Sequence, residues 1–134
     1  MAESIICERA FEFTVRILKL CKPLWQRGPV ARHIASQLIR SASSIGSNAE
    51  EAEEGHTKPD FIAKLSIARN ESRETRYWLR LASRMQIVKH DEITWEMDEI
   101  NQLRSMIISA IKTAQASSSR GQQEQDAQPS SVQS

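Results

Sequence analysis

The amino-acid sequence predicts an all-α protein that folds as an antiparallel up-and-down four-helix bundle. Apolar residues recur with the 3.6-residue period of a helix in four segments, and no segment shows the sustained alternation of a β-strand. The 134 residues include only four glycines and four prolines, so helix breakers are rare and long helices are favoured. Because the connections between the four segments are short, neighbouring helices are expected to pack antiparallel.

The first helix is predicted from about Ser4 to Lys22, because Pro23 cannot continue a helix. After the linker PLWQRGP, a second helix is predicted from Pro29 to Glu54, with Gly55 as its C-terminal cap. The apolar stripe of the first helix comprises Ile6, Ala10, Phe13, Ile17, Leu20 and Cys21, widened by Phe11 and Leu18. The apolar stripe of the second helix comprises Ile34, Leu38, Ala42, Ile45, Ala49 and Ala52.

A third helix is predicted to begin at Thr57, which is spaced from Asp60 as in a capping box, and to end near Val88. A fourth helix is predicted to begin at a cap on Asp91 and to lose its periodicity near Gln115. The inward positions of the third helix are Phe61, Leu65, Ala68, Ser72, Thr75, Leu79 and Ala82, widened by Ile67, Trp78 and Met85. The seam of the fourth helix is formed by Ile93, Met97, Ile100, Leu103, Ile107 and Ile111.

These elements predict one domain, a four-helix bundle at residues 1–115, followed by a disordered Ser/Gln-rich tail at residues 116–134. The chain is long enough for one domain with a hydrophobic core and too short for two domains of ordinary size. The tail contains one aliphatic residue other than alanine, so it cannot bury enough surface to offset its chain entropy.

The cysteines and the N-terminus predict a cytoplasmic protein. Cys7 and Cys21 lie about 21 Å apart along one helix at 1.5 Å per residue, so they cannot form a disulfide with each other. Apolar residues flank both, which is typical of buried structural thiols in a reducing compartment. The N-terminus lacks the pattern of a secretory signal, and no apolar stretch approaches the length of a membrane span.

The residues that could carry catalysis or hold a metal are dispersed, so we expect no enzymatic activity, no cofactor and no small-molecule substrate. A di-iron bundle requires two Glu-x-x-His pairs, and Glu53 with His56 forms the single candidate, interrupted by Gly55. The two cysteines and three histidines lack the spacing of a zinc site. Neither a phosphate-binding glycine loop nor a nucleophile elbow is present in the sequence.

The most informative pattern is a row of arginines on the third helix, which we call the arginine stripe. At 100° per residue its members project within an arc of about 80°. Like charges at this spacing repel each other, so the stripe requires a counter-charge from the same chain, a neighbouring subunit or nucleic-acid phosphates. The net charge of +1 excludes a globally basic coat protein but not such a local patch. The arginine stripe consists of Arg69, Arg73, Arg76, Arg80 and Arg84.

An acidic cluster poses the opposite problem at the end of the second helix, where the helix dipole already disfavours negative charge. We expect cations nearby, from Lys58 and Lys64 or from the arginine stripe of another subunit. The acidic cluster consists of Glu50, Glu51, Glu53 and Glu54.

A third group of polar residues lies beside the apolar stripes of the second and third helices. Buried polar groups need hydrogen-bond partners, so Asn48, Glu71 and Glu74 are expected to form a network with Arg40 or another arginine. We expect this network to fix the register of the bundle. General acid–base catalysis is disfavoured because no nucleophile accompanies these residues.

Several segments resemble a known family. SIGSNAEEAEEG (Ser44 to Gly55) and FIAKLSIARNESRETRYWLRLA (Phe61 to Ala82) resemble the bacterial four-helix-bundle family that includes proteins encoded in intervening sequences of 23S ribosomal RNA genes. EFTVRILKL and QLIRSASSIGSN match as well, so the resemblance covers roughly residues 8 to 112. Relatives often carry Ile-Ala-Glu-Gly after the Ser-x-x-Asn asparagine, whereas Ala-Glu-Glu-Ala follows Asn48 here.

The resemblance implies an antiparallel four-helix bundle that assembles as a homo-oligomer, with a ring-like pentamer expected, and it does not imply an enzyme. One similar protein, the accessory variability determinant of diversity-generating retroelements, engages RNA and a reverse transcriptase through basic surfaces. Two interpretations therefore stay open. The protein is either an accessory protein that associates with RNA or an RNA-handling protein, or a structural or protein-interaction oligomer without a nucleic-acid role.

Overall fold

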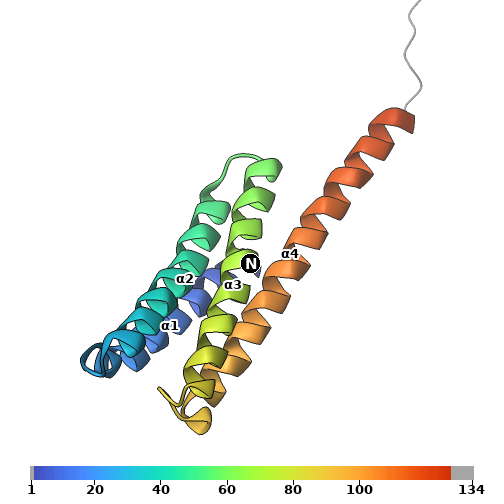
Figure 1. Ribbon diagram of the computed structural model, residues 1–134. Helices are drawn as coiled ribbons and strands as arrows, with labels where there is room; N and C mark the ends of the chain where they lie inside the picture. The colour runs from blue at the N-terminus through green and yellow to red at the C-terminus, as the bar shows by residue number, and fades with distance from the viewer. Residues whose placement is uncertain (1, 128–134) are drawn as a thin grey trace, which may run out of the picture.

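The computed structural model describes residues 2–127 and the side chains of residues 5–117. Within this part of the chain the structure is helical and contains no β-strand, which confirms the predicted all-α class (Figure 1). The four long helices are α1 (Ala2–Cys21), α2 (Pro29–Glu54), α3 (Lys58–Arg84) and α4 (Thr94–Ala127), and two short 3-10 helices, η1 (Lys22–Gln26) and η2 (His90–Ile93), precede α2 and α4.

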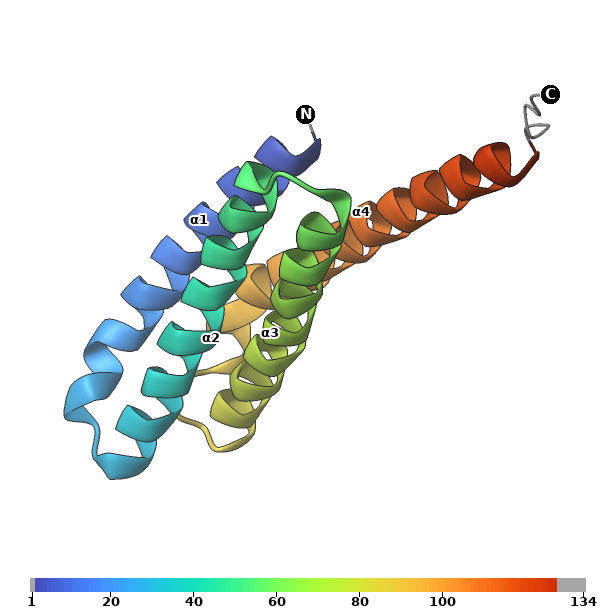
Figure 2. The same ribbon diagram turned by 90° about the horizontal axis from the view of Figure 1, so that it is seen from above.

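The four long helices form an antiparallel bundle in which consecutive helices are neighbours and α4 packs back against α1. Figures 1 and 2 show that the C-terminal half of α4 leaves the bundle and projects beyond the connection between α2 and α3. The helices are therefore close together at the end that holds η1 and η2 and splayed at the other end.

The core is formed by the apolar stripes that the sequence predicts, and every helix contributes to it. Phe13, Leu38, Leu65 and Ile107 are among the residues with almost no exposed surface. Some expected core positions are instead at the surface, because the arcs of α1 and α3 that are buried are narrower than the predicted apolar stripes. These exposed apolar side chains are Phe11, Leu18, Ile67 and Met85.

The boundaries of α3 follow from local chemistry at its two ends. The Thr57 hydroxyl accepts a hydrogen bond from the Asp60 amide at 3.2 Å, as the predicted N-terminal cap requires. The predicted end at Val88 is wrong, because α3 stops at Arg84 and Gln86 adopts a left-handed conformation with φ of 59°. The Ile87 amide then reaches back to the Ala82 carbonyl at 2.9 Å, which closes a Schellman motif.

The predicted cap of the fourth helix on Asp91 is also wrong. Asp91 lies inside η2, and α4 begins only at Thr94. The Glu92 carboxylate accepts a hydrogen bond from the Lys89 amide at 2.7 Å and so stabilises the start of η2. Asp91 and Glu92 are both acidic, and acidic residues favour the first turn of a helix, so the sequence leaves the first residue of α4 ambiguous.

Helix α4 continues beyond Gln115, where its apolar period ends, and reaches Ala127. The expected disordered tail is therefore helical at residues 116–127, while residues 128–134 lie outside the described part of the chain. Alanine, glutamine and glutamate are good helix formers, and no proline occurs in α4, so the backbone can stay helical beyond the last apolar position. Among the described side chains the last buried residue of α4 is Ile111, close to the predicted boundary at residue 115.

Candidate functional site

The arginine stripe lies along one side of α3, next to the arc that is buried in the core. Ser72, Thr75 and Leu79 are fully buried on that arc, and their positions direct the intervening arginines toward the flank of the helix. Arg73, Arg80 and Arg84 are exposed, whereas Arg69 and Arg76 are half-buried. The packing of α3 therefore presents a continuous row of guanidinium groups on the surface.

The arginines of the stripe differ from other arginines of the bundle in their partners. Among the side chains of residues 5–117, no ion pair or hydrogen bond links the guanidinium group of any of the five to another residue. The Nε atom of Arg76 is buried without a hydrogen-bond partner within this described region. By contrast, Arg9, Arg16 and Arg40 each form an ion pair with a glutamate. The stripe thus lacks an internal counter-charge in the part of the chain that the structure describes.

A sixth arginine, Arg104 on α4, extends this positively charged surface. Met97 borders a hollow beside Arg80 and Arg84, and Arg104 follows Met97 by seven residues on the same side of α4. Because α3 and α4 are antiparallel (Figure 1), Arg104 lies about 10 Å further along α4, toward the level of Arg76. The Nε atom of Arg104 is also buried without a partner among the described residues.

The sequence did not single out Arg104, because its four-residue neighbours on α4 are apolar and carry no charge pattern. Only the pairing of α4 with α3 brings Arg104 to the side of the stripe.

The acidic cluster is partly neutralised within the chain. Glu51 forms an ion pair with Lys64 at 2.8 Å, as the sequence predicts for one of the two nearby lysines. The Cys7 thiol donates a hydrogen bond to Glu53 at 3.2 Å, which connects the end of α2 to α1. Glu50 and Glu54 are exposed. The structure places this cluster at the splayed end of the bundle, whereas the stripe runs toward the opposite end.

The polar network forms around Arg40, but without Asn48. Arg40 bridges α2 and α3 by pairing with Glu71 at 3.2 Å and with Glu74. The Glu74 carboxylate also accepts a hydrogen bond from the Trp78 indole at 3.3 Å. These contacts, chiefly the hydrogen bond from Arg40, lower the pKa of Glu74 and keep it ionised.

Asn48 was expected in this network and lies outside it. Its amide donates hydrogen bonds to the Ser44 carbonyl at 2.8 Å and to the Ser44 hydroxyl at 3.0 Å, both one turn earlier on α2. A short amide side chain forms a hydrogen bond more readily with the backbone of its own helix than with a guanidinium group on another turn.

A second set of charged contacts, between α1 and α4, was missed from the sequence. Arg9 pairs with Glu99 through two nitrogens at 2.9 and 2.7 Å. Arg16 lies 3.5 Å from Glu96 and stacks over the Trp95 ring at 4.3 Å. Arg9 and Arg16 are seven residues apart and so share one face, which is the only signal that the sequence offered.

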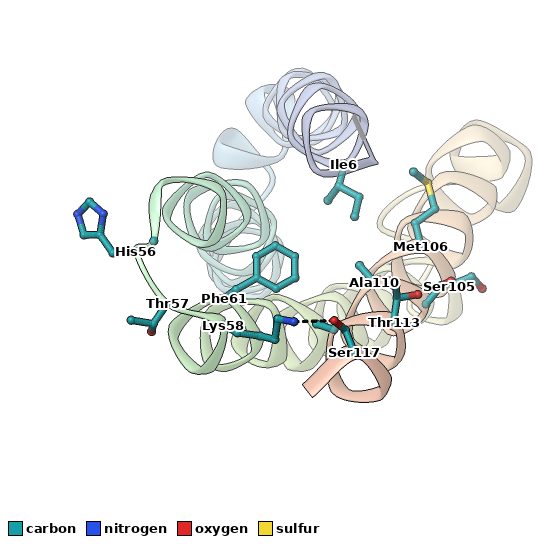
Figure 3. A pocket seen from close by; sticks show the side chains of 13 residues that line it. Ile6, His56, Thr57, Lys58, Phe61, Ser105, Met106, Ala110, Thr113 and Ser117 are labelled. Carbon is teal, nitrogen blue, oxygen red and sulfur yellow. Dashed lines mark hydrogen bonds between the residues drawn. The ribbon is translucent and has the colours of Figure 1, made fainter. Parts of the chain in front are cut away.

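A larger hollow of about 760 Å³ opens at the splayed end of the bundle, between α1, the α2–α3 connection and α4. Figure 3 shows Ile6, Phe61 and Met106 pointing into it, whereas His56 points away. Lys58 at its rim donates a hydrogen bond to the Ser117 hydroxyl at 2.7 Å. The lining of this hollow mixes apolar side chains with hydroxyl groups such as those of Ser105, Ser109 and Thr113.

No group of three or more potential metal ligands comes together among the described residues. Glu53 and His56, the candidate pair in the sequence, are separated by the end of α2, as the position of Gly55 indicates.

Comparison with known proteins places this arrangement in a family. Residues 2–109 match the model of the family described as 23S rRNA-intervening sequence protein. The chain belongs to this family. The match includes the whole of α3, and therefore the arginine stripe, and stops before the projecting part of α4.

A solved structure supports membership of the 23S rRNA-intervening sequence proteins. It is the crystal structure of a protein of unknown function from the S23 ribosomal protein family of Bacteroides thetaiotaomicron VPI-5482. The two chains are 35% identical and superpose with a TM-score of 0.77 over 84% of this chain and 99% of that chain. No curated protein matches this sequence. The family and this neighbour establish the bundle without assigning it an activity.

No helix within the described residues is long and apolar enough to cross a lipid bilayer.

Proposed function

We propose that this protein is a non-enzymatic, oligomeric accessory protein of the cytoplasm that binds RNA phosphates through its arginine stripe. The observation that carries the proposal is that Arg69, Arg73, Arg76, Arg80 and Arg84 share one flank of α3 without a counter-charge among the described side chains. Guanidinium groups match phosphate oxygens with two parallel hydrogen bonds, so an RNA backbone supplies the missing anions.

The dimensions of the stripe suit a nucleic-acid backbone. Arg69 and Arg84 are separated by about 22 Å along the helix axis, enough to follow several consecutive phosphates. Arg104 broadens the surface toward α4, and the exposed side chains of Arg73, Arg80 and Arg84 can donate to an incoming phosphate. The resemblance to the accessory variability determinant, which engages RNA through basic surfaces, supports the same proposal.

The test is a triple variant, Arg73→Gln, Arg76→Gln and Arg80→Gln. Binding to a structured and to a single-stranded RNA is measured by fluorescence anisotropy over a series of salt concentrations. We expect weaker binding and a salt dependence flatter by roughly 0.7–0.9 log unit per lost phosphate contact, with helicity and oligomer mass unchanged.

A matched control removes the same charge elsewhere. Lys19→Gln, Lys22→Gln and Arg32→Gln change three exposed cations on α1, η1 and α2. This variant should retain RNA affinity, which separates a local effect of the stripe from an effect of net charge. Wild-type protein without salt-sensitive binding to either RNA at low salt would overturn the proposal. Intact binding in the stripe variant would place the RNA surface elsewhere.

A second candidate function, a structural or protein-interaction oligomer, is favoured by a row of exposed apolar residues. Phe11, Leu18 and Trp25 are spaced seven residues apart along α1 and η1 and are 59%, 44% and 48% exposed. Such a row is typical of a surface that packs against another chain. In this case the stripe pairs with the acidic cluster of a neighbouring subunit, and the stripe variant should loosen the assembly while wild-type RNA affinity is negligible.

A further inference from the structure

A second hollow, of about 520 Å³, lies where the arginine stripe meets the end of α3. It is bordered by Tyr77, Arg80 and Arg84 of α3, by His90 and Ile93 of η2 and by Met97 of α4. Its volume falls in the range of pockets that hold small organic groups. Residues from the last turn of α3 and from η2 line it together, so the hollow lies where α3 ends and the chain turns toward α4.

The chemistry of this hollow combines an apolar floor with unpaired cations. Ile93 is buried and Met97 is partly buried, so the floor is apolar. Arg80 and Arg84 are exposed and form no ion pair with any residue that the structure describes. His90 adds ring nitrogens that can donate or accept hydrogen bonds.

Tyr77 supplies an aromatic surface at the border of the hollow. Tyr77 is 54% exposed, so a ligand in the hollow can reach it. An edge-to-face contact with Trp78, at a centroid distance of 5.2 Å and an angle of 80°, supports the ring from one side. An exposed but supported ring beside two arginines is the arrangement that single-stranded nucleic-acid binding sites use for base stacking.

We infer that this hollow receives one unstacked nucleotide of single-stranded RNA, with its base against Tyr77 and its phosphates on Arg80 and Arg84. The inference rests on the proposed RNA-binding function and adds a substrate class to it. Bases inside an A-form duplex are stacked and cannot enter a hollow, whereas loops and single strands can present a base. The protein therefore prefers single-stranded or looped RNA to a continuous duplex.

The experiment compares a single-stranded 12-nucleotide RNA with the corresponding duplex in the full-length protein. Tyr77→Ala should weaken binding of the single strand by about five- to 150-fold, which is the loss of one base–aromatic stack, and should leave duplex binding and the salt dependence unchanged. Tyr77→Phe keeps the ring and should bind the single strand as the wild type does.

Ile67→Ala is a matched control, because Ile67 is an exposed apolar residue of the same helix that does not border the hollow. It should leave both affinities unchanged. Thermal melting of each variant shows whether the fold is intact, and the exposure of Tyr77 predicts that it is. An additional measurement with a nucleoside monophosphate distinguishes a free nucleotide from RNA, and tighter binding of the monophosphate than of the 12-nucleotide strand would overturn the inference.

The two proposals fail in different ways. If the wild type binds neither RNA in a salt-sensitive manner, the proposed function fails. If it binds single strand and duplex equally, and Tyr77→Ala changes neither affinity, the stripe still binds RNA but the hollow does not take a base.

Discussion

Two phenylalanines of α1 show how far the environment of a residue depends on its position around a helix. Phe13 is fully buried and stacks near Trp95 at a centroid distance of 6.4 Å, whereas Phe11, two residues earlier, is exposed. Two residues correspond to about 200° around the helix, so the two rings point in nearly opposite directions. The same side chain is therefore part of the core at one position and part of the surface at the other.

This difference predicts the effect of removing each ring. Phe13→Ala should lower the free energy of unfolding by about 3–5 kcal/mol, because it leaves a cavity in the core. Phe11→Ala should change it by less than about 0.5 kcal/mol in the monomeric fold. Urea unfolding followed by circular dichroism measures both values. Equal destabilisation by the two substitutions would contradict the assigned orientation of α1.

Cys21 carries a second prediction at the residue scale. Burial raises the pKa of its thiol to about 12, so at pH 8 only about one thiol in ten thousand is the reactive thiolate. In a Cys7→Ser variant, iodoacetamide should label Cys21 very slowly in the folded protein and rapidly in urea. Rapid labelling of the folded protein at pH 8 would show that the N-terminal half of the bundle opens.

At the scale of elements, charged contacts link helices that are neighbours in the bundle. Arg40 connects α2 to α3, and the pairs of Arg9 with Glu99 and Arg16 with Glu96 connect α1 to α4. Such partly exposed pairs contribute little stability each, but they favour one register of antiparallel helices over shifted ones. Arg9, Arg16 and Arg40 thus link helices through glutamates, whereas the guanidinium groups of the stripe form no such pair among the described residues.

The contact of Arg40 with Glu74 predicts a pH dependence. The pKa of Glu74 is lower in the folded protein than in the unfolded chain, so its contribution to stability is complete above the unfolded pKa of about 4.3 and is lost as pH falls through the folded pKa. Arg40→Gln should therefore reduce stability at pH 7 by up to about 1 kcal/mol, a value limited by solvent screening. The difference from the wild type should shrink below about pH 4.

Urea unfolding at pH 7 and at pH 3 measures this difference. Lys64→Gln removes the more exposed pair with Glu51 and should have a smaller effect at pH 7. A constant effect of Arg40→Gln across this pH range would indicate that the aliphatic part of Arg40, and not its charge, stabilises the contact.

The projecting part of α4 predicts how truncation affects the thermal stability of the bundle. Removing residues 117–134 should change the melting temperature by no more than about 1–2 °C, because it deletes one exposed hydrogen bond, from Lys58 to Ser117, and no buried side chain among those described. Ile111→Ala, in the packed part of the same helix, should instead cost about 2–5 kcal/mol. A loss of several degrees on truncation would show that the C-terminal segment docks on the bundle.

In the molecule as a whole, the four helices bury the apolar core between them. The apolar row on α1 and η1 and the arginine stripe on α3 stay at the surface. The proposed oligomer would cover the apolar row of Phe11, Leu18 and Trp25, and RNA would cover the stripe. These two surfaces belong to different helices, so assembly and RNA binding can be separated by substitution.

The assembly is tested by sedimentation velocity at tens of micromolar. We expect an oligomer of the 15.2 kDa chain, with a pentamer favoured by the family resemblance. Leu18→Glu should reduce the mass by placing a charge in the apolar row, whereas Lys22→Gln beside it should not. A strictly monomeric wild-type protein would exclude the proposed assembly.

Local sequence patterns were sufficient to predict the number of long helices and most of their buried residues. Leu65, Ala68 and Leu79, for example, follow from the period of α3 alone, because a helix with one apolar face can be stable only with that face buried. The start of α3 at Thr57 was equally predictable, since a capping side chain acts on the backbone within three residues.

Which polar residues meet depends instead on how the helices pack against one another. It joined Arg40 to Glu71 and Glu74, left Asn48 on its own helix turn, and brought Arg104 toward the arginine stripe. It also decided that Phe11 and Met85 are exposed, because the width of a buried arc depends on how many helices surround it. Helix period is a local property of the chain, whereas the partner of a charge and the coverage of a flank depend on residues that are distant in sequence.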